Sequence, residues 1–187
     1  MNKLVPRHRG LVASKEKKER EREREREKRV MKIVFLDIDG VLNSVDWYIR
    51  RKAMEEQLGA MPRRHREIDP AAVERLNRLL EATGAEVVIS STWRRLHSLR
   101  EIEEYLRACG YHGPRLLDDT PVLCTLRGLE IQDWLDHARD DITPDDIVIL
   151  DDDSDMEHLE DRLVLTRHTT GLLDEHVERA IEMLRSS

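Results

Sequence analysis

The sequence is poor in cysteine and in aromatic residues, and it contains no long hydrophobic run. Its two cysteines, Cys109 and Cys124, lie far apart and match neither a zinc motif nor a disulfide framework, which favours a cytoplasmic location. Aromatic residues make up only 4% of the chain, which argues against a base-stacking surface of the kind that binds single strands. No apolar stretch approaches the roughly 18 residues of a membrane span, and none follows the basic N-terminus, so we expect neither a membrane partner nor a signal peptide.

Charged residues are abundant and unevenly distributed over the 187 residues, whose net charge is −7. Residues 1–30 hold 12 Lys or Arg and 6 Glu, a net +6, while the rest of the chain holds 20 basic and 33 acidic residues, a net −13. Every residue from Lys15 to Arg29 is charged. Such a segment has nothing to bury, so we expect a charged extension over residues 1–30, partly helical or disordered, ahead of one domain over residues 31–187. Its Glu residues weaken any attraction to nucleic acid, and binding of a protein partner is the alternative use of this arm.

Within residues 31–187, short β-branched apolar runs alternate with segments of helical spacing. The apolar runs predict four buried strands, over residues 33–36, 85–89, 147–150 and 163–166. Capping residues and apolar stripes predict helices that start after Asn43, Asp69 and Ser98 and near Leu129, with a last helix around residues 177–184. Residues 111–126 predict a loop with at most a short strand. This alternation predicts an α/β fold, a Rossmann-like parallel sheet flanked by helices.

The stretch after the first strand, about residues 44–68, is predicted to form a small cap-like insert. It starts with a helix and continues into a basic loop at residues 62–66. Because the insert follows the first acidic strand end directly, its arginines are expected either to fold over the site and meet an anionic substrate or to remain in a solvated loop. The helix is predicted from the spacing of its apolar residues, Val45, Ile49, Ala53, Met54 and Leu58.

Three of the predicted strands end in polar residues. Asp37 and Asp39 follow the first strand, Ser90 follows the second strand, and the third strand leads into an acidic run from Asp151 to Asp155. The carboxyl ends of parallel strands share one edge of the sheet, so these groups are expected to meet in one crevice. Carboxylates brought together at neutral pH must hold a cation or shift their pKa values, and ligands that are all oxygen suit Mg²⁺. The candidate Mg²⁺ ligands are therefore Asp37, Asp39, Asp151, Asp152 and Asp155.

A phosphate bound beside Mg²⁺ also needs hydrogen-bond donors. Ser90, directly after the second strand, offers a hydroxyl, and Arg127 offers a permanent cation at the start of a helix. Ser91 is an alternative to Ser90, and Arg94 and Arg115 are alternatives to Arg127. One carboxylate of such a site can attack phosphorus, and a second one two residues away can protonate the leaving oxygen and later activate water.

Four segments in this order, FLDIDGVLN, VVISS, RG and VILDDDSD, together resemble the four motifs of the haloacid dehalogenase (HAD) superfamily of phosphatases. The resemblance covers about residues 31–184. The sequences SSTWR, RGLEIQDWL and LDDDSDM look closest to the small HAD domain of Swiss Army Knife RNA repair proteins. The second Asp of the first motif, Asp39, favours phosphoryl transfer over dehalogenation, because family members that attack carbon lack it.

The resemblance implies a role for each matching residue. Asp37 would be the nucleophile and a Mg²⁺ ligand, and Asp39 would be the general acid and base, with its backbone carbonyl on the metal. Ser90 would bind the transferring phosphoryl group, and Arg127 would neutralise the aspartyl-phosphate. The acidic run would supply the remaining metal ligation, through Asp151 with support from Asp152 or Asp155.

From these residues we expect a Mg²⁺-dependent HAD-type phosphatase that hydrolyses a phosphomonoester through an aspartyl-phosphate. Its substrate would be a small phosphomonoester, a nucleotide or the terminal phosphate of a nucleic acid. The alternative is a non-catalytic metal-binding interaction module with the same fold. A receiver-like domain would need a phosphorylated Asp where Ser90 ends the middle strand, and a metal-dependent nuclease would not call for Ser90 and Arg127.

Overall fold

The structure, a computed structural model, describes residues 31–54, 66–123, 125–138 and 142–185. The charged extension over residues 1–30 and most of the predicted basic loop lie outside the described residues, so both stay predictions. Among the described residues, no helix combines the length and the apolar character needed to cross a bilayer.

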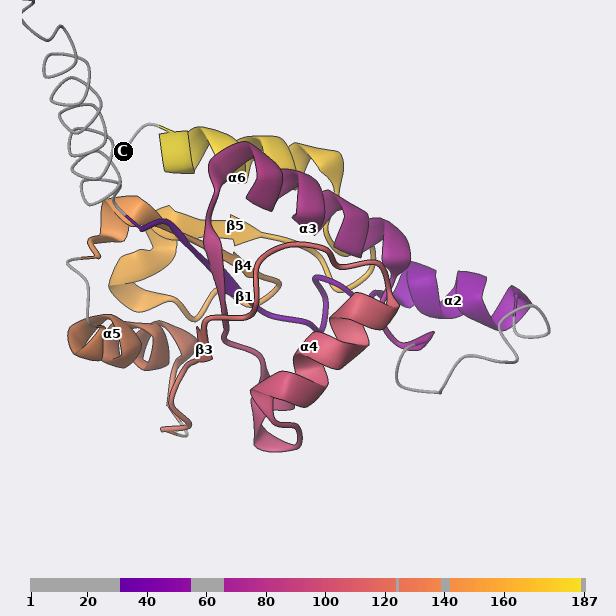
Figure 1. The fold of residues 1–187 in the computed structure, drawn as a ribbon, viewed down its shortest axis with the longest axis horizontal. Coiled ribbons are helices and arrows are strands. Elements are labelled where there is room, and N and C mark those ends of the chain that lie inside the picture. The colour runs from indigo at the N-terminus through magenta and orange to yellow at the C-terminus, as the bar shows by residue number, and fades with distance from the viewer. Residues whose placement is uncertain (1–30, 55–65, 124, 139–141, 186–187) are drawn as a thin grey trace, which may run out of the picture. The chain divides into compact units, whose positions relative to one another are not determined.

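A parallel sheet of five strands forms the centre of the fold (Figure 1). The strands are β1 (Ile33–Leu36), β2 (Glu86–Ile89), β3 (Asp118–Asp119), β4 (Ile147–Asp151) and β5 (Leu163–Leu165). They lie side by side in the order β3-β2-β1-β4-β5, and every neighbouring pair is parallel. The chain therefore builds the sheet outward from β1 in one direction and then returns to add β4 and β5 on the other side. The four longer strands were predicted, and β3 is the short strand within the predicted loop.

Helices cover both faces of the sheet (Figure 1), and hydrophobic side chains on both faces are buried beneath them. Val34 and Leu36 of β1 belong to the larger core cluster, whereas Ile33 and Phe35 belong to the second one. Neighbouring residues of a strand alternate between faces, so β1 is buried from both sides, as its apolar run predicts. The larger cluster packs under α3 (Pro70–Thr83), α4 (Leu99–Ala108) and α6 (Asp174–Arg185), and the second under α5 (Arg127–His137) and the 3₁₀ helix η4 (Glu157–Arg162). The predicted Rossmann-like fold is thereby confirmed.

Two helix starts follow the capping residues that the sequence indicates. The side chain of Asp69 accepts a hydrogen bond from the Ala71 amide at 2.9 Å, and Pro70 is the first residue of α3. The predicted capping box of α4 is also present, since Ser98 and Glu101 each bond the other's backbone. Both predictions are confirmed.

The helix of the predicted insert, α2 (Val45–Ala53), packs differently from what its apolar spacing suggests. Its one buried residue is Trp47, whose indole Nε1 donates to the Arg66 carbonyl at 2.8 Å. Figure 1 shows α2 at one side of the molecule, away from the sheet. A helix in this place has little core to cover, so its apolar stripe faces outward: Val45, Ile49 and Met54 are 43%, 60% and 42% exposed.

A substitution at Phe35 tests how strongly the second core cluster holds the sheet to α5. Its ring is fully buried and meets the Trp134 ring edge-on, with ring centroids 5.3 Å apart. Replacing Phe35 by Ala should lower the free energy of unfolding by about 3–5 kcal/mol, because it leaves a cavity in a packed core. Urea denaturation followed by circular dichroism measures this loss. The control is Leu96→Ala, at a side chain that is 82% exposed, and it should change the stability by about 0.5 kcal/mol at most.

Candidate active site

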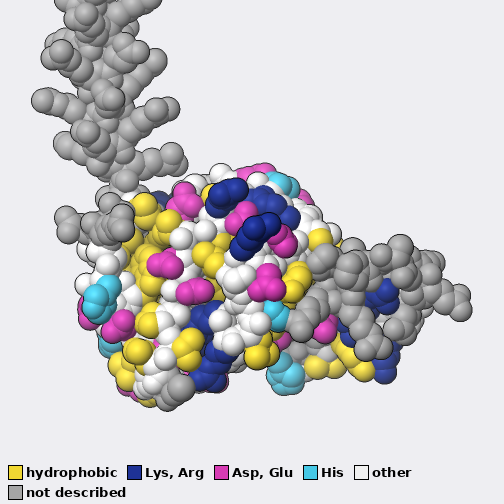
Figure 2. Space-filling view, turned by 60° about the horizontal axis from the view of Figure 1, so that its bottom comes forward, with side chains coloured by type: hydrophobic (Ala, Val, Ile, Leu, Met, Phe, Trp, Pro, Cys, Tyr) yellow, Lys and Arg dark blue, Asp and Glu magenta, His cyan; other side chains and the backbone are white. Residues whose placement is uncertain are grey.

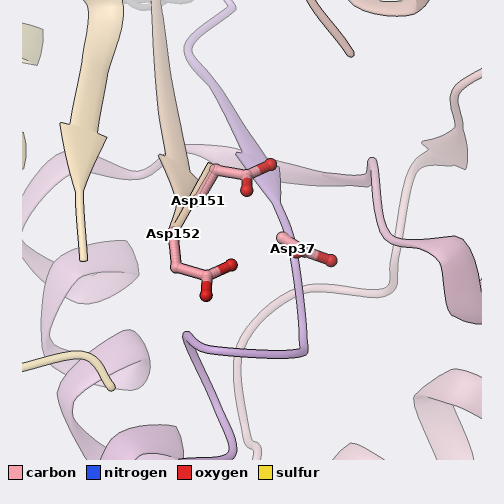
Figure 3. Close-up of side chains that lie close together, drawn as sticks. All are labelled: Asp37, Asp151 and Asp152. Atoms are coloured by element: carbon pink, nitrogen blue, oxygen red, sulfur yellow. The ribbon is translucent and has the colours of Figure 1, made fainter. Parts of the chain in front are cut away.

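Two of the predicted carboxylates lie side by side at the carboxyl edge of the sheet. Asp37 directly follows β1 and Asp151 ends β4, and the pairing of Leu36 with Leu150 puts both aspartates at the same level. The order of strands reverses between β1 and β4, which is where open α/β sheets bind their ligands. Figure 3 shows these side chains together with Asp152, the residue that follows β4. One carboxylate oxygen of each of the three lies within 4.8 Å of the others.

Burial makes this carboxylate group unfavourable in its fully ionised form. It raises the pKa of Asp37, which is 5% exposed, although the charge of Arg127 and a hydrogen bond from the Ser91 hydroxyl oppose the shift. Burial and the neighbouring charge of Asp37 raise the pKa of the fully buried Asp151 to about 7. Burial also raises the pKa of Asp152, which is only partly buried. A bound cation would relieve this repulsion.

The donor set fits Mg²⁺. The three carboxylates offer oxygen ligands only, at a spacing that one small cation can bridge. The Asp151 Oδ2 atom is buried and has no hydrogen-bond partner among the described residues, as expected of an oxygen that can coordinate a metal ion. Asp39 and Asp155 lie outside this close group, so the five predicted ligands do not all come together through their side chains.

Arg127 brings a positive charge to the two buried carboxylates. Its Nε atom lies 3.6 Å from Asp151 Oδ2, and its Nη2 atom lies 3.9 Å from Asp37 Oδ2. These distances are longer than direct hydrogen bonds, and the guanidinium acts mainly through its charge. The third nitrogen, Nη1, is buried without a hydrogen-bond partner among the described residues. Arg127 therefore combines compensation of charge with a donor that is still free for an anion.

Asp155 determines where α5 starts and thereby where Arg127 lies. Its Oδ2 atom accepts a hydrogen bond from the Arg127 amide at 2.9 Å, and its carbonyl accepts one from the Gly128 amide at 3.1 Å. A Cβ atom on Gly128 would lie 2.1 Å from the Met156 carbonyl oxygen, so only glycine permits this approach. The helix starts two residues before the predicted Leu129, because its cap comes from a distant loop that local spacing does not reveal.

Both serines after β2 belong to the site, in different ways. Ser90 lies beside Asp37 across the sheet, since its amide donates to the Leu36 carbonyl at 2.9 Å, and its buried hydroxyl has no described partner. The Ser91 hydroxyl lies near the Asp37 carboxyl and acts to lower its pKa. The preference for Ser90 rests on its place after the strand, whereas this influence on Asp37 favours Ser91.

Sequence reasoning did not single out Thr120, which extends the same row of residues across the sheet. The pairing of Ile89 with Asp119 puts Thr120 beside Ser90. The four residues at the ends of four adjacent strands therefore lie at one level, in the order Asp151, Asp37, Ser90 and Thr120. The Thr120 hydroxyl is buried and has no partner among the described residues. Its signal in the sequence is only a polar residue after the two-residue strand β3, which is too short to recognise beforehand.

Arg94, one alternative to Arg127, is fully engaged elsewhere. It donates to the carbonyls of Ser90, Ser91 and Thr120 at 2.8, 2.6 and 2.8 Å, and its guanidinium forms a buried ion pair with Glu130 of α5. Arg94 thus ties the turn after β2 to the segment after β3 and to α5. Arg115, the other alternative, is exposed on the segment before β3.

Asp39 is exposed, and other side chains hold both of its oxygens. Oδ1 accepts a hydrogen bond from Asn43 Nδ2 at 2.6 Å, and Oδ2 accepts one from the indole Nε1 of Trp93 at 3.0 Å. Sequence reasoning missed both partners, although Trp93 lies within the SSTWR segment that the family resemblance includes.

Gly40 lets the loop after Asp39 pass close to the Asp152 carboxyl. Its φ of +72° lies in the left-handed region, and a Cβ atom there would lie 2.2 Å from the carboxyl carbon of Asp152. The Thr166 hydroxyl, which follows β5, holds the loop by donating to the Gly40 carbonyl at 2.8 Å.

Comparison with known families agrees with this geometry. The family described as "HAD domain in Swiss Army Knife RNA repair proteins" matches residues 33–177, a range that includes every candidate site residue from Asp37 to Asp155. Searches of curated proteins and of solved structures gave no significant match. The chain therefore belongs to the family of HAD domains of Swiss Army Knife RNA repair proteins, with the α/β fold and the general phosphatase-like character of the HAD superfamily.

Proposed function

We propose that this domain is a Mg²⁺-dependent phosphatase that hydrolyses phosphomonoesters through an aspartyl-phosphate on Asp37. The observation that supports it best is the surroundings of Asp37: one carboxylate, buried at the point where the strand order reverses, lies within reach of Asp151, Asp152 and Arg127. A nucleophile for phosphorus needs neighbours that neutralise the anionic substrate, and these residues supply a cation and a cation-binding group.

Asp37, Asp151 and Asp152 would hold the Mg²⁺ ion, with Asp155 as the residue that keeps α5 in place beside it. The Asp39 carbonyl is a further proposed ligand. When bound, the ion supplies positive charge that polarises the phosphoryl oxygens and compensates the buried carboxylates.

In the first step, an Asp37 oxygen forms a bond to phosphorus while the bond from phosphorus to the leaving oxygen breaks. Asp39 gives a proton to that oxygen, so the alcohol leaves uncharged. In the second step, Asp39 takes a proton from water, whose oxygen attacks phosphorus and releases Asp37 and inorganic phosphate. Arg127 Nη1 and the hydroxyl of Ser90 or Ser91 are the donors available to the phosphoryl oxygens.

For the substrate, we propose a nucleotide or the terminal phosphate of a nucleic acid, and the family description supports this choice. Figure 2 shows one face of the domain, on which acidic side chains are scattered among basic and hydrophobic ones. Among the described residues drawn there, the basic side chains form separate groups with acidic and hydrophobic side chains between them. That surface suits a short or terminal phosphate better than a long nucleic-acid backbone, whose binding needs many cationic contacts.

The direct test is phosphate release by the purified full chain, with and without Mg²⁺, from p-nitrophenyl phosphate, mononucleotides and oligonucleotides with a 3′- or 5′-phosphate. Release that depends on Mg²⁺ is expected. If none of these compounds is hydrolysed, the non-catalytic metal-binding module becomes the better interpretation.

Asp37→Asn should abolish turnover, with at least about a 10³-fold fall in kcat, because an amide cannot form the aspartyl-phosphate. The fold should remain intact, since the change removes one charge from a crowded acidic site. Circular dichroism checks the fold and the phosphate-release assay checks activity. Substantial activity in a folded Asp37→Asn variant would exclude Asp37 as the nucleophile.

Mg²⁺ should stabilise the folded chain through the same carboxylates. At a free concentration about 100-fold above its Kd, a ligand that binds only the folded state adds about 2.7 kcal/mol to the free energy of unfolding. Chemical denaturation with and without Mg²⁺ should show this gain in the wild type and its loss in Asp151→Asn. Asp153→Asn is the matched control, because Asp153 is an exposed carboxylate of the same loop and should leave the gain unchanged. Equal stabilisation of Asp151→Asn and the wild type would contradict the proposed metal site.

A further inference from the structure

The turn after β2 lies beside both carboxylates that the proposed reaction uses. The Ser91 hydroxyl acts to lower the pKa of Asp37, and two residues later the indole Nε1 of Trp93 donates to Asp39 Oδ2 at 3.0 Å. Trp93 is part of the short 3₁₀ helix η2 (Thr92–Arg95), which Ser91 caps through its side chain. One short segment thus lies beside the nucleophile at one position and contacts the acid/base residue at another.

The indole of Trp93 is itself held in place by its neighbours. Its ring meets the rings of His97 and Tyr105 edge-on, with centroids 5.8 and 6.3 Å away, and these two rings also contact each other at 5.4 Å. Arg94, the next residue, bonds the backbone carbonyls of Ser90 and Ser91. The position of the indole N–H is therefore determined by the fold of the turn and by α4, which carries Tyr105.

Because the Asp39 side chain is exposed, the orientation of its carboxyl depends on hydrogen-bond donors such as the Trp93 indole. An exposed carboxyl samples several rotamers in water, and ordering it for proton transfer costs conformational entropy. Two donors, Trp93 Nε1 and Asn43 Nδ2, restrict the Asp39 oxygens to one orientation. An indole N–H and an amide NH₂ only donate hydrogen bonds, so neither group can take the proton that Asp39 must deliver.

We propose that Trp93 is a positioning residue for Asp39, whose orientation it fixes for proton transfer to the leaving oxygen in the first step. The proposal rests on the proposed phosphatase function and assigns to Trp93 a role in the protonation step alone. Proton transfer matters most when the leaving group is a poor one, such as an aliphatic or ribose hydroxyl. p-Nitrophenolate departs without a proton, so the rate of the first step with this leaving group should depend little on the orientation of Asp39.

Trp93→Phe tests this role, because phenylalanine keeps an aromatic ring in the cluster and removes the N–H. On a nucleoside monophosphate, kcat/KM, which covers the steps up to formation of the aspartyl-phosphate and excludes its hydrolysis, should fall by about 10-fold or more, within the range that acid–base catalysis contributes. On p-nitrophenyl phosphate, kcat/KM should change by no more than about 2-fold, since that leaving group needs little protonation. In an Asp39→Asn background, Trp93→Phe should cause no further fall in kcat/KM on either substrate.

The matched control is Trp134→Phe. The Trp134 indole also donates to a carboxylate, Asp118 Oδ2 at 2.8 Å, and also makes an edge contact with another ring, that of Phe35. This aspartate has no part in the proposed chemistry, so any effect of Trp134→Phe should be the same on both substrates.

The contact itself can be tested without turnover. The chain has three tryptophans, so its ¹H–¹⁵N spectrum should show three indole signals, and Trp47→Phe and Trp134→Phe identify the one from Trp93 by elimination. In the full chain, Asp39→Asn should shift that signal and leave the Trp134 signal in place. An unmoved Trp93 signal would overturn the proposal, even if Trp93→Phe itself failed to fold.

These measurements distinguish a failure of the proposed phosphatase function from a failure of the positioning role of Trp93. A wild-type chain that hydrolyses neither substrate would refute the proposed function, whatever the indole spectrum shows. An active wild type in which Trp93→Phe lowers kcat/KM equally on both substrates, or leaves it unchanged on the nucleoside monophosphate, would refute the positioning role alone. A selective loss on the nucleoside monophosphate, absent from Trp134→Phe, is the expected result.

Discussion

The structure depends on two carboxylates, Asp37 and Asp151, that are buried next to each other at the ends of adjacent strands. Burial of one ionised carboxyl is costly, and burial of two in contact is more so. The pKa of each is raised for that reason. The fold compensates with one guanidinium, that of Arg127, placed within 4 Å of both side chains. A single arginine leaves negative charge unbalanced once Asp152 is included, and a bound cation would balance this residual charge.

The acidic residues that look alike in the sequence have different tasks in the fold. Asp37, Asp151 and Asp152 form the close group, and their oxygens are the ones that a metal can share. One carboxylate oxygen and the carbonyl of Asp155 accept hydrogen bonds from the first amides of α5, where a negative charge also complements the helix dipole. Asp39 faces solvent between an indole and an amide donor. Proximity in the chain therefore says little about which carboxylate binds metal, because each task is decided by a partner that lies elsewhere in the sequence.

The parts of the fold that could be predicted are those determined by local patterns. The apolar run of β1 and the cap of α3 at Asp69 depend on neighbouring residues, and both appear as expected. The rule that polar residues collect at the carboxyl ends of parallel strands placed Asp37 and Asp151 together. The orientation of α2 and the start of α5 could not be predicted, because they depend on what core the helix can cover and on a cap from a distant loop. The same holds for Thr120, whose strand has only two residues.

Arg94 shows why residue type alone does not reveal an anion-binding group. It lies one residue from Trp93 and within the SSTWR segment, yet its guanidinium is used for backbone carbonyls and for Glu130. A buried ion pair gains little net stability by itself, since desolvation offsets the attraction. Its value here is geometric: one guanidinium joins the turn after β2, which carries Ser91 and Trp93, to the segment after β3 and to α5, which carries Arg127. The proposed donors for the phosphate and the donor that holds the proposed acid/base residue are thus fixed relative to one another by an interaction that lies outside the proposed chemistry.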